Sequence, residues 1–372
     1  MAKQFKRHRD YGFFDQDIRL SKLTKLGDPL IRLSEGDDFE LFRVLLEDGF
    51  YKQSKNKGGR RPYDYILMFK ICILQRYYNL SDDQAEFQIN DRMSFMRFLD
   101  LTISDDIPDS KTIWNFTEKL KDLSLAKPLF DLFLEELNKL NLIVNEGKIV
   151  DASFVEAPRQ RNSREENKHI KEEGKAPDEW KDTPSKLAQK DVNARWTKKN
   201  NQNYFGYKNH TKIDSGSKLI DNYSVSDASV HDSQAMEGLF EEKDASQPFY
   251  ADSAYTGPKQ EEAIKKYEMK NEVHEKGHKN SPLTEEQKAS NTEKSRTRAR
   301  VEHIFGFMEM NMGGMFFRKV GIKRAETMIG LMNLTYNMFR KIQLITIQRD
   351  KCVQLAINKV FNTLIINKLS NL

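Results

Sequence analysis

The first 140 residues carry apolar side chains at the spacing of helices. Between residues 66 and 77 apolar positions recur every three to four residues, so their side chains share one face of a helix. Ser81 and Gln84 have the spacing of a capping box, which predicts that another helix begins there. Residues 129–140 form a further amphipathic run. The pattern therefore predicts an all-helical N-terminal domain over residues 1–140.

From about residue 146 the apolar period changes from that of a helix to that of a strand. Residues 147–157 alternate between two faces, which predicts a strand that runs through Asp151. Two more strands, YFGYKNHTKID and KLIDNYSVSD, are predicted on either side of a Ser-Gly turn at residue 215. Residues 158–200 are highly charged and poor in apolar side chains, which predicts an exposed insertion.

The remainder of this second half alternates helices with short strands. A helix over residues 232–242 precedes a strand that ends at Asp252, a helix over 258–268, a possible strand, and a long helix containing RTRARVEHIFGFMEM. Three strands followed by alternating helix and strand predict a mixed sheet flanked by helices. The predicted class is α/β with a ribonuclease H-like catalytic domain over residues 146–345, followed by a helical tail over 346–372.

Composition excludes several classes of protein. The 372 residues include 61 Lys and Arg against 56 Asp and Glu, and a net charge of +5 does not by itself indicate nucleic acid. Cys72 and Cys352 are too few for a disulfide framework or a cysteine-rich zinc site, which fits a reducing cytoplasm. The N-terminus lacks the apolar segment of a signal peptide, and no stretch approaches the ~20 apolar residues of a membrane span. We therefore expect a cytoplasmic protein with no membrane partner.

Three acidic residues have a context that indicates chemistry. Asp151 lies within an otherwise apolar strand, where a charge is costly unless it is paired or binds a metal. Asp252 ends a strand, and Glu302 borders the apolar face of the long helix. Each also has a structural interpretation, since Asp252 could cap a turn and Glu302 could pair with Arg298 on the surface.

A shared pocket for these carboxylates would require cations. Two like charges ~4 Å apart repel by ~4 kcal/mol at an effective dielectric constant near 20. Magnesium prefers carboxylate oxygens, bound water and substrate phosphates. Two such ions ~3.5–4 Å apart can stabilise both the attacking and the leaving oxygen of a phosphodiester displacement.

Several long segments resemble a known family. They are KIVDASFVEAPRQRN, GYKNHTKID, LIDNYSVSDASVHDSQ, FYADSAYTG and TRARVEHIFGFMEMNMGG, and they are similar to segments of the DDE transposases of the insertion-sequence-five family. The segment that begins GGRRPYDYILMFK resembles the helical N-terminal domain of that family, which implies a role in DNA binding or dimerisation for residues 1–140. The resemblance covers roughly residues 40–345, and it places the family's two aspartates on Asp151 and Asp252 and its glutamate on Glu302.

The resemblance implies a bacterial DNA transposase that uses magnesium or manganese, as two ions. In such enzymes water cuts the phosphodiester bond at a transposon end, and the freed 3′-hydroxyl attacks target DNA. No covalent protein–DNA intermediate is required. The implied partners are double-stranded DNA, as terminal inverted repeats and as target, and a second copy of the chain, because two ends are joined.

Basic residues gather beside the three acids and in a turn near residue 60. Phosphate contacts supply half or more of the hydrogen bonds between proteins and DNA, which favours a DNA-binding role over a merely solvated face. The candidates are Arg60, Arg61, Arg159, Arg161, Arg164, Lys208, Lys294, Arg296, Arg298 and Arg300.

Two alternative functions follow from the same sequence. His274 and His278 fit the H-E-x-x-H pattern of zinc proteases, which requires both histidines on one helix. A glycine and the polar residues after it favour a loop instead. The second alternative is a catalytically inactive, transposase-derived DNA-binding protein, which would need none of the three acids. Asp232 is expected to cap the helix that follows it.

Overall fold

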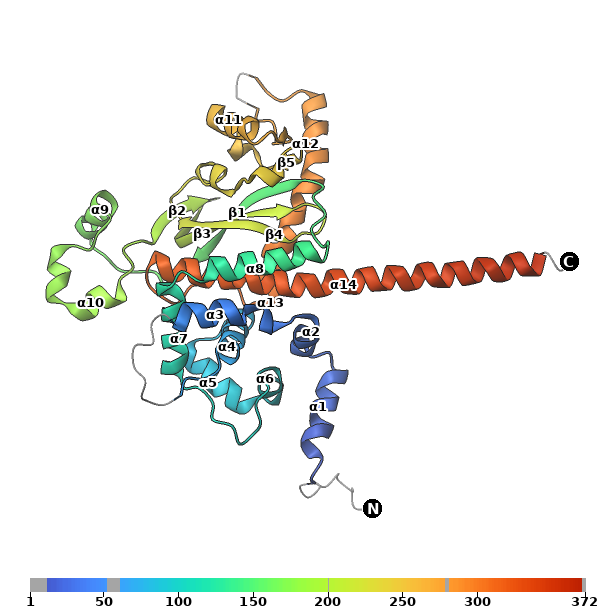
Figure 1. Cartoon of the computed structure of the whole chain (residues 1–372). Coiled ribbons are helices and arrows are strands. Elements are labelled where there is room, and N and C mark those ends of the chain that lie inside the picture. The colour runs from blue at the N-terminus through green and yellow to red at the C-terminus, as the bar shows by residue number, and fades with distance from the viewer. Residues whose placement is uncertain (1–11, 52–60, 200, 278–280, 370–372) are drawn as a thin grey trace, which may run out of the picture.

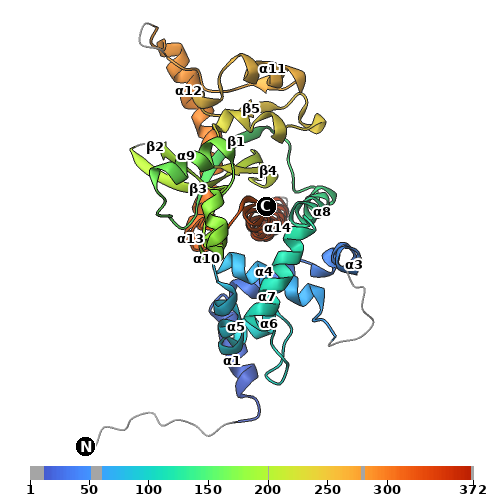
Figure 2. The same cartoon turned by 90° about the vertical axis from the view of Figure 1, so that its left-hand side faces the viewer.

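The computed structural model describes residues 12–51, 61–199, 201–277 and 281–369. It has a helical N-terminal part, a mixed β-sheet, and a long helix α14 (Ile322–Leu369) that lies between them (Figure 1). Figure 2 views α14 end-on, with the sheet on one side and the N-terminal helices on the other. The predicted α/β class is confirmed.

The N-terminal part is helical throughout its described elements, as the apolar spacing predicted. The predicted capping box is present, because the Ser81 hydroxyl accepts from Gln84 N and the Gln84 side chain accepts from Ser81 N. The helices are α1 (Asp15–Lys25), α2 (Pro29–Gly36), α3 (Arg43–Tyr51), α4 (Tyr65–Tyr77), α5 (Asp82–Asp91), α6 (Met93–Phe98), α7 (Ser110–Asp122) and α8 (Ala126–Lys139).

The sheet is built around strand β1 (Lys148–Glu156). On one side β1 pairs antiparallel with β3 (Gln202–Asp214), and β3 pairs antiparallel with β4 (Ile220–Asp227). On its other side β1 pairs parallel with β5 (Pro248–Tyr250), which in turn pairs parallel with β6 (Lys270–Asn271). The path β4-β3-β1-β5-β6, with three antiparallel strands followed by two that are parallel to the first, has the ribonuclease H-like arrangement that the sequence predicted.

The charged insertion between β1 and β3 has more structure than its composition indicated. It contains α9 (Arg164–Glu173), α10 (Pro184–Gln189) and β2 (Arg195–Lys199), which pairs with the first part of β3. Trp180 is buried and its indole nitrogen donates to the Glu166 carboxylate over 2.8 Å. One buried aromatic residue thus organises a segment that protrudes from the body in Figure 1.

Two expected helices have a different form. Residues 232–244 make three short 3-10 turns where a helix was predicted over 232–242. Met236, Leu239 and Phe240 all pack into a small core beside the sheet, and Gly238 lies between them. The long helix is divided into α12 (Glu285–Arg298), a 3-10 turn, and α13 (Glu302–Asn311). Helix α11 (Pro258–Lys266) forms as expected.

Helix α14 connects the two halves of the molecule. It packs against α8 and α4 on one side and against β4 on the other, and a single apolar cluster includes residues from all of these elements. Residues 346–369, expected as a separate tail, continue this helix without a break. Among the described residues, no helix combines the length and apolar character needed to cross a bilayer.

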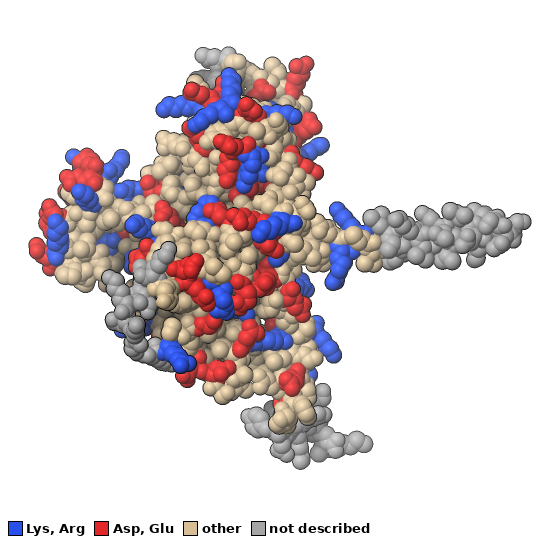
Figure 3. Space-filling model, in the orientation of Figure 1, with Lys and Arg blue, Asp and Glu red and all other residues tan. Residues whose placement is uncertain are grey.

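Charge is distributed evenly over the face seen in Figure 3. Lys and Arg side chains alternate there with Asp and Glu side chains, and neither sign forms a continuous surface. The near balance of 61 basic and 56 acidic residues is thus repeated locally on this face. Any binding site for an anionic partner must therefore be sought in smaller groups of residues.

Candidate active site

Asp151 occupies the middle of β1, where its carboxylate is largely buried. One oxygen accepts the backbone N–H of Ala152 at 2.8 Å, and the other accepts from the Arg298 guanidinium at 3.2 Å. Burial raises the pKa of Asp151 to about 6, although the Ala152 N–H and Arg298 oppose the rise; the charge of Asp252 adds to it. The carboxylate is therefore in a place where a second cation would be favourable.

Asp252 follows β5, the strand that runs parallel to β1 beside it. Its side chain accepts from Ala254 N at 2.8 Å and begins a 3-10 turn, as its capping interpretation predicted. The carboxylate is nevertheless close enough to Asp151 to raise the pKa of that residue. Capping a turn and facing Asp151 are compatible, because a carboxylate has two oxygens and several lone pairs.

Tyr255 is a member of this site that sequence reasoning missed. It is buried, its hydroxyl has no hydrogen-bond partner among the described residues, and its pKa is well above the ordinary value. Burial is the main cause, followed by the charges of Asp151, Asp232 and Asp252. The signal in the sequence was its position three residues after Asp252, one short turn away. The hydroxyl keeps its proton and is available as a donor.

Asp232 was expected to cap a helix and instead pairs with a lysine. His231 caps the 3-10 turn that replaces the helix, while the Asp232 carboxylate lies 2.8 Å from Lys208 Nζ. Lys208 also donates to the carbonyl of Val230 at 2.6 Å and is almost fully buried. This lysine, one of the candidate DNA contacts, is therefore used inside the protein.

Glu302 is exposed and begins α13, one helical turn after Arg298. The 3-10 turn between the two residues packs against β1, so the start of α13 is held near the strand that carries Asp151. Among the described residues, no three His, Cys, Asp or Glu side chains lie in an arrangement that could hold a metal ion. The structure thus brings Asp151 and Asp252 together with Arg298, and it does not gather Glu302 into a trio with them.

The chemistry of the Asp151–Asp252 pair suits a hard divalent cation. Asp151 and Asp252 offer carboxylate oxygens, the ligands that magnesium and manganese prefer. Arg298 supplies a single compensating positive charge to two negative ones. Two acids beside one arginine keep a net negative charge, which a bound ion would balance.

The H-E-x-x-H segment does not form the helix that a zinc protease needs. Residues 272–277 have no regular secondary structure, and His278 lies outside the described residues. His274 Nε2 is 3.3 Å from the Ser295 hydroxyl, and burial lowers the pKa of this histidine. The loop interpretation of the segment is the one that the described residues support.

The other candidate DNA contacts divide by exposure. Lys294 donates to the carbonyl of Val273 and Arg300 to that of Ser215, so both are directed toward backbone. Arg60 lies outside the described residues. The exposed candidates are Arg61, Arg159, Arg161, Arg164 and Arg296.

Comparison with known proteins gives matches over both halves of the chain. Residues 144–338 match the family model described as a transposase DDE domain, and residues 18–119 match a transposase domain of the DUF772 type. One solved structure is titled as a cryo-EM structure of a piggyBac transposase synaptic complex with hairpin DNA. The alignment has 13% sequence identity and a TM-score of 0.42 over 87% of this chain and 76% of that chain.

Proposed function

Because the chain belongs to the family of transposases with a DDE domain, we propose that Asp151, Asp252 and Glu302 are the acids with which it cuts and joins DNA. The chain is a DNA transposase, a polynucleotidyl transferase of the DDE type. The proposal assigns its phosphodiester chemistry to three residues out of the 56 Asp and Glu. The observation that carries it is the pair of carboxylates formed by Asp151, which is largely buried, and Asp252, which is half-buried, with an arginine bound to Asp151.

Asp151 and Asp252 would hold the divalent ions, which we propose to be two Mg²⁺ or Mn²⁺. When bound, such ions supply Lewis acidity toward a phosphodiester and lower the pKa of a water nucleophile. The protein residues do the positioning: Ala152 N–H and Ala254 N–H each fix one carboxylate oxygen. Tyr255 is buried near both carboxylates, and its hydroxyl has no hydrogen-bond partner among the described residues.

Arg298 occupies the position that a cation would take beside Asp151. We propose that ion and DNA binding release Arg298 from Asp151 to a DNA phosphate, and that Glu302, one turn later on the same helical segment, then completes the ligand set. Arginine suits both states, because its guanidinium pairs with carboxylates and with phosphates. The proposal requires a movement of the segment around residues 298–302 on binding.

The remaining assignments follow from the same premise. The substrate is double-stranded DNA, as transposon ends and as target, and its phosphates contact exposed arginines such as Arg159 and Arg296. A homodimer on DNA would bring two ends together, and the protein would act in the bacterial cytoplasm, on the nucleoid. The alternative is a DNA-binding protein without catalysis, which would bind the same DNA and leave its phosphodiester bonds uncut.

The test is cleavage of a duplex made from the DNA that flanks the coding sequence, with Mg²⁺ or Mn²⁺. Asp252→Ala should bind this duplex like the wild type and cut it ~10³-fold more slowly, because loss of an ion ligand removes several kcal/mol of transition-state stabilisation. Glu262→Ala, an exposed acid on α11, is the control and should cut normally. Equal cutting by Asp252→Ala and wild type would reject the assignment, and binding without cutting by both would favour the inactive alternative.

A further inference from the structure

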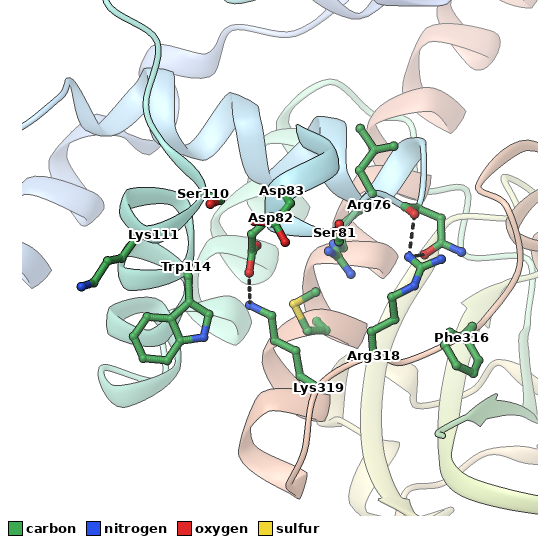
Figure 4. Close-up of a pocket in the computed structure, with 13 residues that line it drawn as sticks. Arg76, Ser81, Asp82, Asp83, Ser110, Lys111, Trp114, Phe316, Arg318 and Lys319 are labelled. Atoms are coloured by element: carbon green, nitrogen blue, oxygen red, sulfur yellow. Dashed lines mark hydrogen bonds and ion pairs between the residues drawn. The ribbon is translucent and has the colours of Figure 1, made fainter. Parts of the chain in front are cut away.

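A second concave site lies far along β1 from the acids, between the N-terminal helices and the segment that follows α13. The cavity has a volume of about 350 Å³ and is lined by α4, α5, α7 and residues 316–319 (Figure 4). Its charged lining consists of four cations and two acids: Arg76, Lys111, Arg318, Lys319, Asp82 and Asp83. Nothing in the proposed chemistry uses these residues.

The cations of this cavity are only partly neutralised by the protein. Lys319 Nζ lies 3.6 Å from an Asp82 oxygen, and it is buried without a hydrogen-bond partner among the described residues. The other Asp82 oxygen accepts from the Gln75 amide at 2.8 Å. Arg318 donates to the carbonyl and the side chain of Asn79 at 2.7 and 2.9 Å. An anion in the cavity would supply the acceptor that Lys319 lacks.

Mutual repulsion of the cations also favours an anion in the cavity. Burial lowers the pKa of Arg76 to about 10, and the charge of Arg318 contributes to that shift. Burial also lowers the pKa of Lys319; the charge of Asp82 opposes this shift, and the charge of Arg76 adds to it. In the absence of an anion the folded protein therefore keeps like charges close together at a cost in stability.

Aromatic rings border the cations and narrow the class of anion. The Trp114 side chain is 43% exposed and that of Phe316 is 40% exposed, and both line the cavity. Exposed flat rings beside a basic groove are typical of surfaces that contact nucleotides, where phosphates meet cations and sugars or bases meet rings. A free inorganic anion has no sugar or base to place against the rings.

The cavity is coupled rigidly to the strand that carries Asp151. Glu156, at the end of β1, receives a hydrogen bond from Phe317 N at 2.7 Å and donates one to the carbonyl of Met315 at 3.0 Å. Phe316, between them, lines the cavity. Asp151 and Glu156 are five residues apart, which spans ~17 Å along a strand. That distance is ~5 nucleotides along one strand of B-form DNA.

We propose that this cavity binds a backbone phosphate of the transposon-end DNA about five nucleotides from the scissile phosphate, with Arg76, Arg318 and Lys319 as its donors. The assignment rests on the proposed function, because it takes the Asp151 pair as the point of cleavage. Strand β1 then acts as a spacer of fixed length between the cleaved bond and a phosphate clamp. The helical N-terminal part contributes to the clamp through α4, α5 and α7.

The experiment measures DNA affinity against salt for Lys319→Met, in the Asp252→Ala background so that nothing is cut. The probe is the same duplex from the DNA that flanks the coding sequence. Loss of one phosphate contact should reduce the slope of log K against log salt by ~0.9, which is a loss of about fivefold in affinity at 0.15 M salt. Lys139→Met, an exposed lysine on α8 remote from the cavity, is the matched control and should keep the full slope.

The thermal midpoint is the control for folding. Lys319→Met should unfold at the same temperature as its parent or higher, because it removes a repelled charge. Arg318→Gln, at an exposed position, repeats the measurement if the first variant unfolds early. Phosphate ethylation should interfere with binding ~5 nucleotides from the cut for the parent and not for Lys319→Met.

The outcomes separate the two proposals. Suppose that both cavity variants keep the full salt slope and that the protein which retains Asp252 cuts the duplex normally. This result overturns the clamp and leaves the proposed function intact. A parent protein that fails to bind the duplex at any salt concentration overturns both. The salt slope could instead be reduced while ethylation interferes at a quite different position. That result would retain the phosphate contact and overturn the spacing of about five nucleotides from the cut.

Discussion

The first residue and the middle of strand β1 differ in how their charges are neutralised by neighbouring side chains. At its first residue, Lys148 lies 3.0 Å from an Asp221 oxygen, and Lys212 on β3 lies 2.6 Å from Asp244. All four side chains are almost entirely shielded from solvent. Three residues along β1, Asp151 has one arginine as its partner and a second carboxylate close by.

The pKa values of two carboxylates express this difference. Burial alone would raise the pKa of Asp221, but Lys212, Lys148 and Lys243 outweigh it and hold that pKa far below its ordinary value. Burial also dominates at Asp151, where the opposing groups are weaker and the pKa rises to about 6. Two buried acids in one sheet therefore differ by the number of cations around them.

The comparison teaches where to look for function in a chain with many charges. In the network around Lys148, three lysines lie within 3.3 Å of Asp221 oxygens, so this acid needs no further cation. The charge of the Asp151–Asp252 pair is only partly neutralised by the protein, and so is the charge of the cationic cavity beside Phe316. Incomplete neutralisation inside a folded protein is what a bound ion or phosphate would correct.

The largest expected effect is on stability, in the buried network of lysines and acids around Lys148. Lys212→Met leaves Asp244, Glu241 and Asp221 without their shared cation and should destabilise the fold by ~3–5 kcal/mol. Urea unfolding at pH 7 measures this difference. Lys168→Ala removes an exposed lysine that pairs with Glu172 at 4.0 Å, and as the control it should change stability by well under ~1 kcal/mol. Equal effects of the two substitutions would mean that the buried network does not hold the sheet together.

The next effect has the opposite sign and depends on pH. Asp151 has a folded pKa of about 6 against an ordinary value of 3.8, so its ionisation weakens the folded state. Wild-type stability, relative to Asp151→Asn, should be highest below pH 3.8, fall as pH rises through 6, and level off above it. The total is ~3 kcal/mol, from about two pH units at 1.36 kcal/mol each.

Thermal unfolding between pH 4 and 8 without divalent ions measures the curve for both proteins. Added Mg²⁺ at pH 7 should raise the midpoint of the wild type more than that of Asp151→Asn, because an ion that binds only the folded state stabilises it. A wild type that gains stability relative to Asp151→Asn as pH rises would contradict the incomplete charge balance around Asp151.

The smallest effect concerns the single arginine of the incomplete site. Arg298→Met removes the partner of Asp151 at a position that is 25% exposed, so it should alter stability by no more than ~1 kcal/mol. It should raise the pKa of Asp151 further, since Arg298 opposes the rise. The carboxyl carbon shift of Asp151 by NMR reports this pKa, and a decrease would show that Arg298 does not face the carboxylate.

The sequence predicted what depends on local order. The alternation around Asp151 defined β1, the Ser-Gly turn at residue 215 defined the β3–β4 hairpin, and the apolar run before Asp252 located β5. Each of these signals lies within one element. The mixed sheet flanked by helices then followed from the succession of elements, and it was confirmed.

The sequence could not predict what depends on distant partners. Lys148 and Asp244 are far apart in the chain, and a lysine in a strand has the same pattern whether it faces solvent or a buried acid. Tyr255 and the cavity were missed for the same reason, because their neighbours come from separate elements. The helix expected over residues 232–242 was wrong since its apolar residues serve the core in a less regular backbone.

Helix α14 would convert a small tilt at its buried base into a large displacement of its tip. It is buried through Lys341 and exposed from Ile345, and its remaining turns extend away from the protein (Figure 1). Residues 346–369 make a rod ~35 Å long at 1.5 Å per residue. A tilt of ~10° at its buried base would therefore carry its tip by ~6 Å. Anything that holds the far end would transmit force directly to the layer between the sheet and the N-terminal helices.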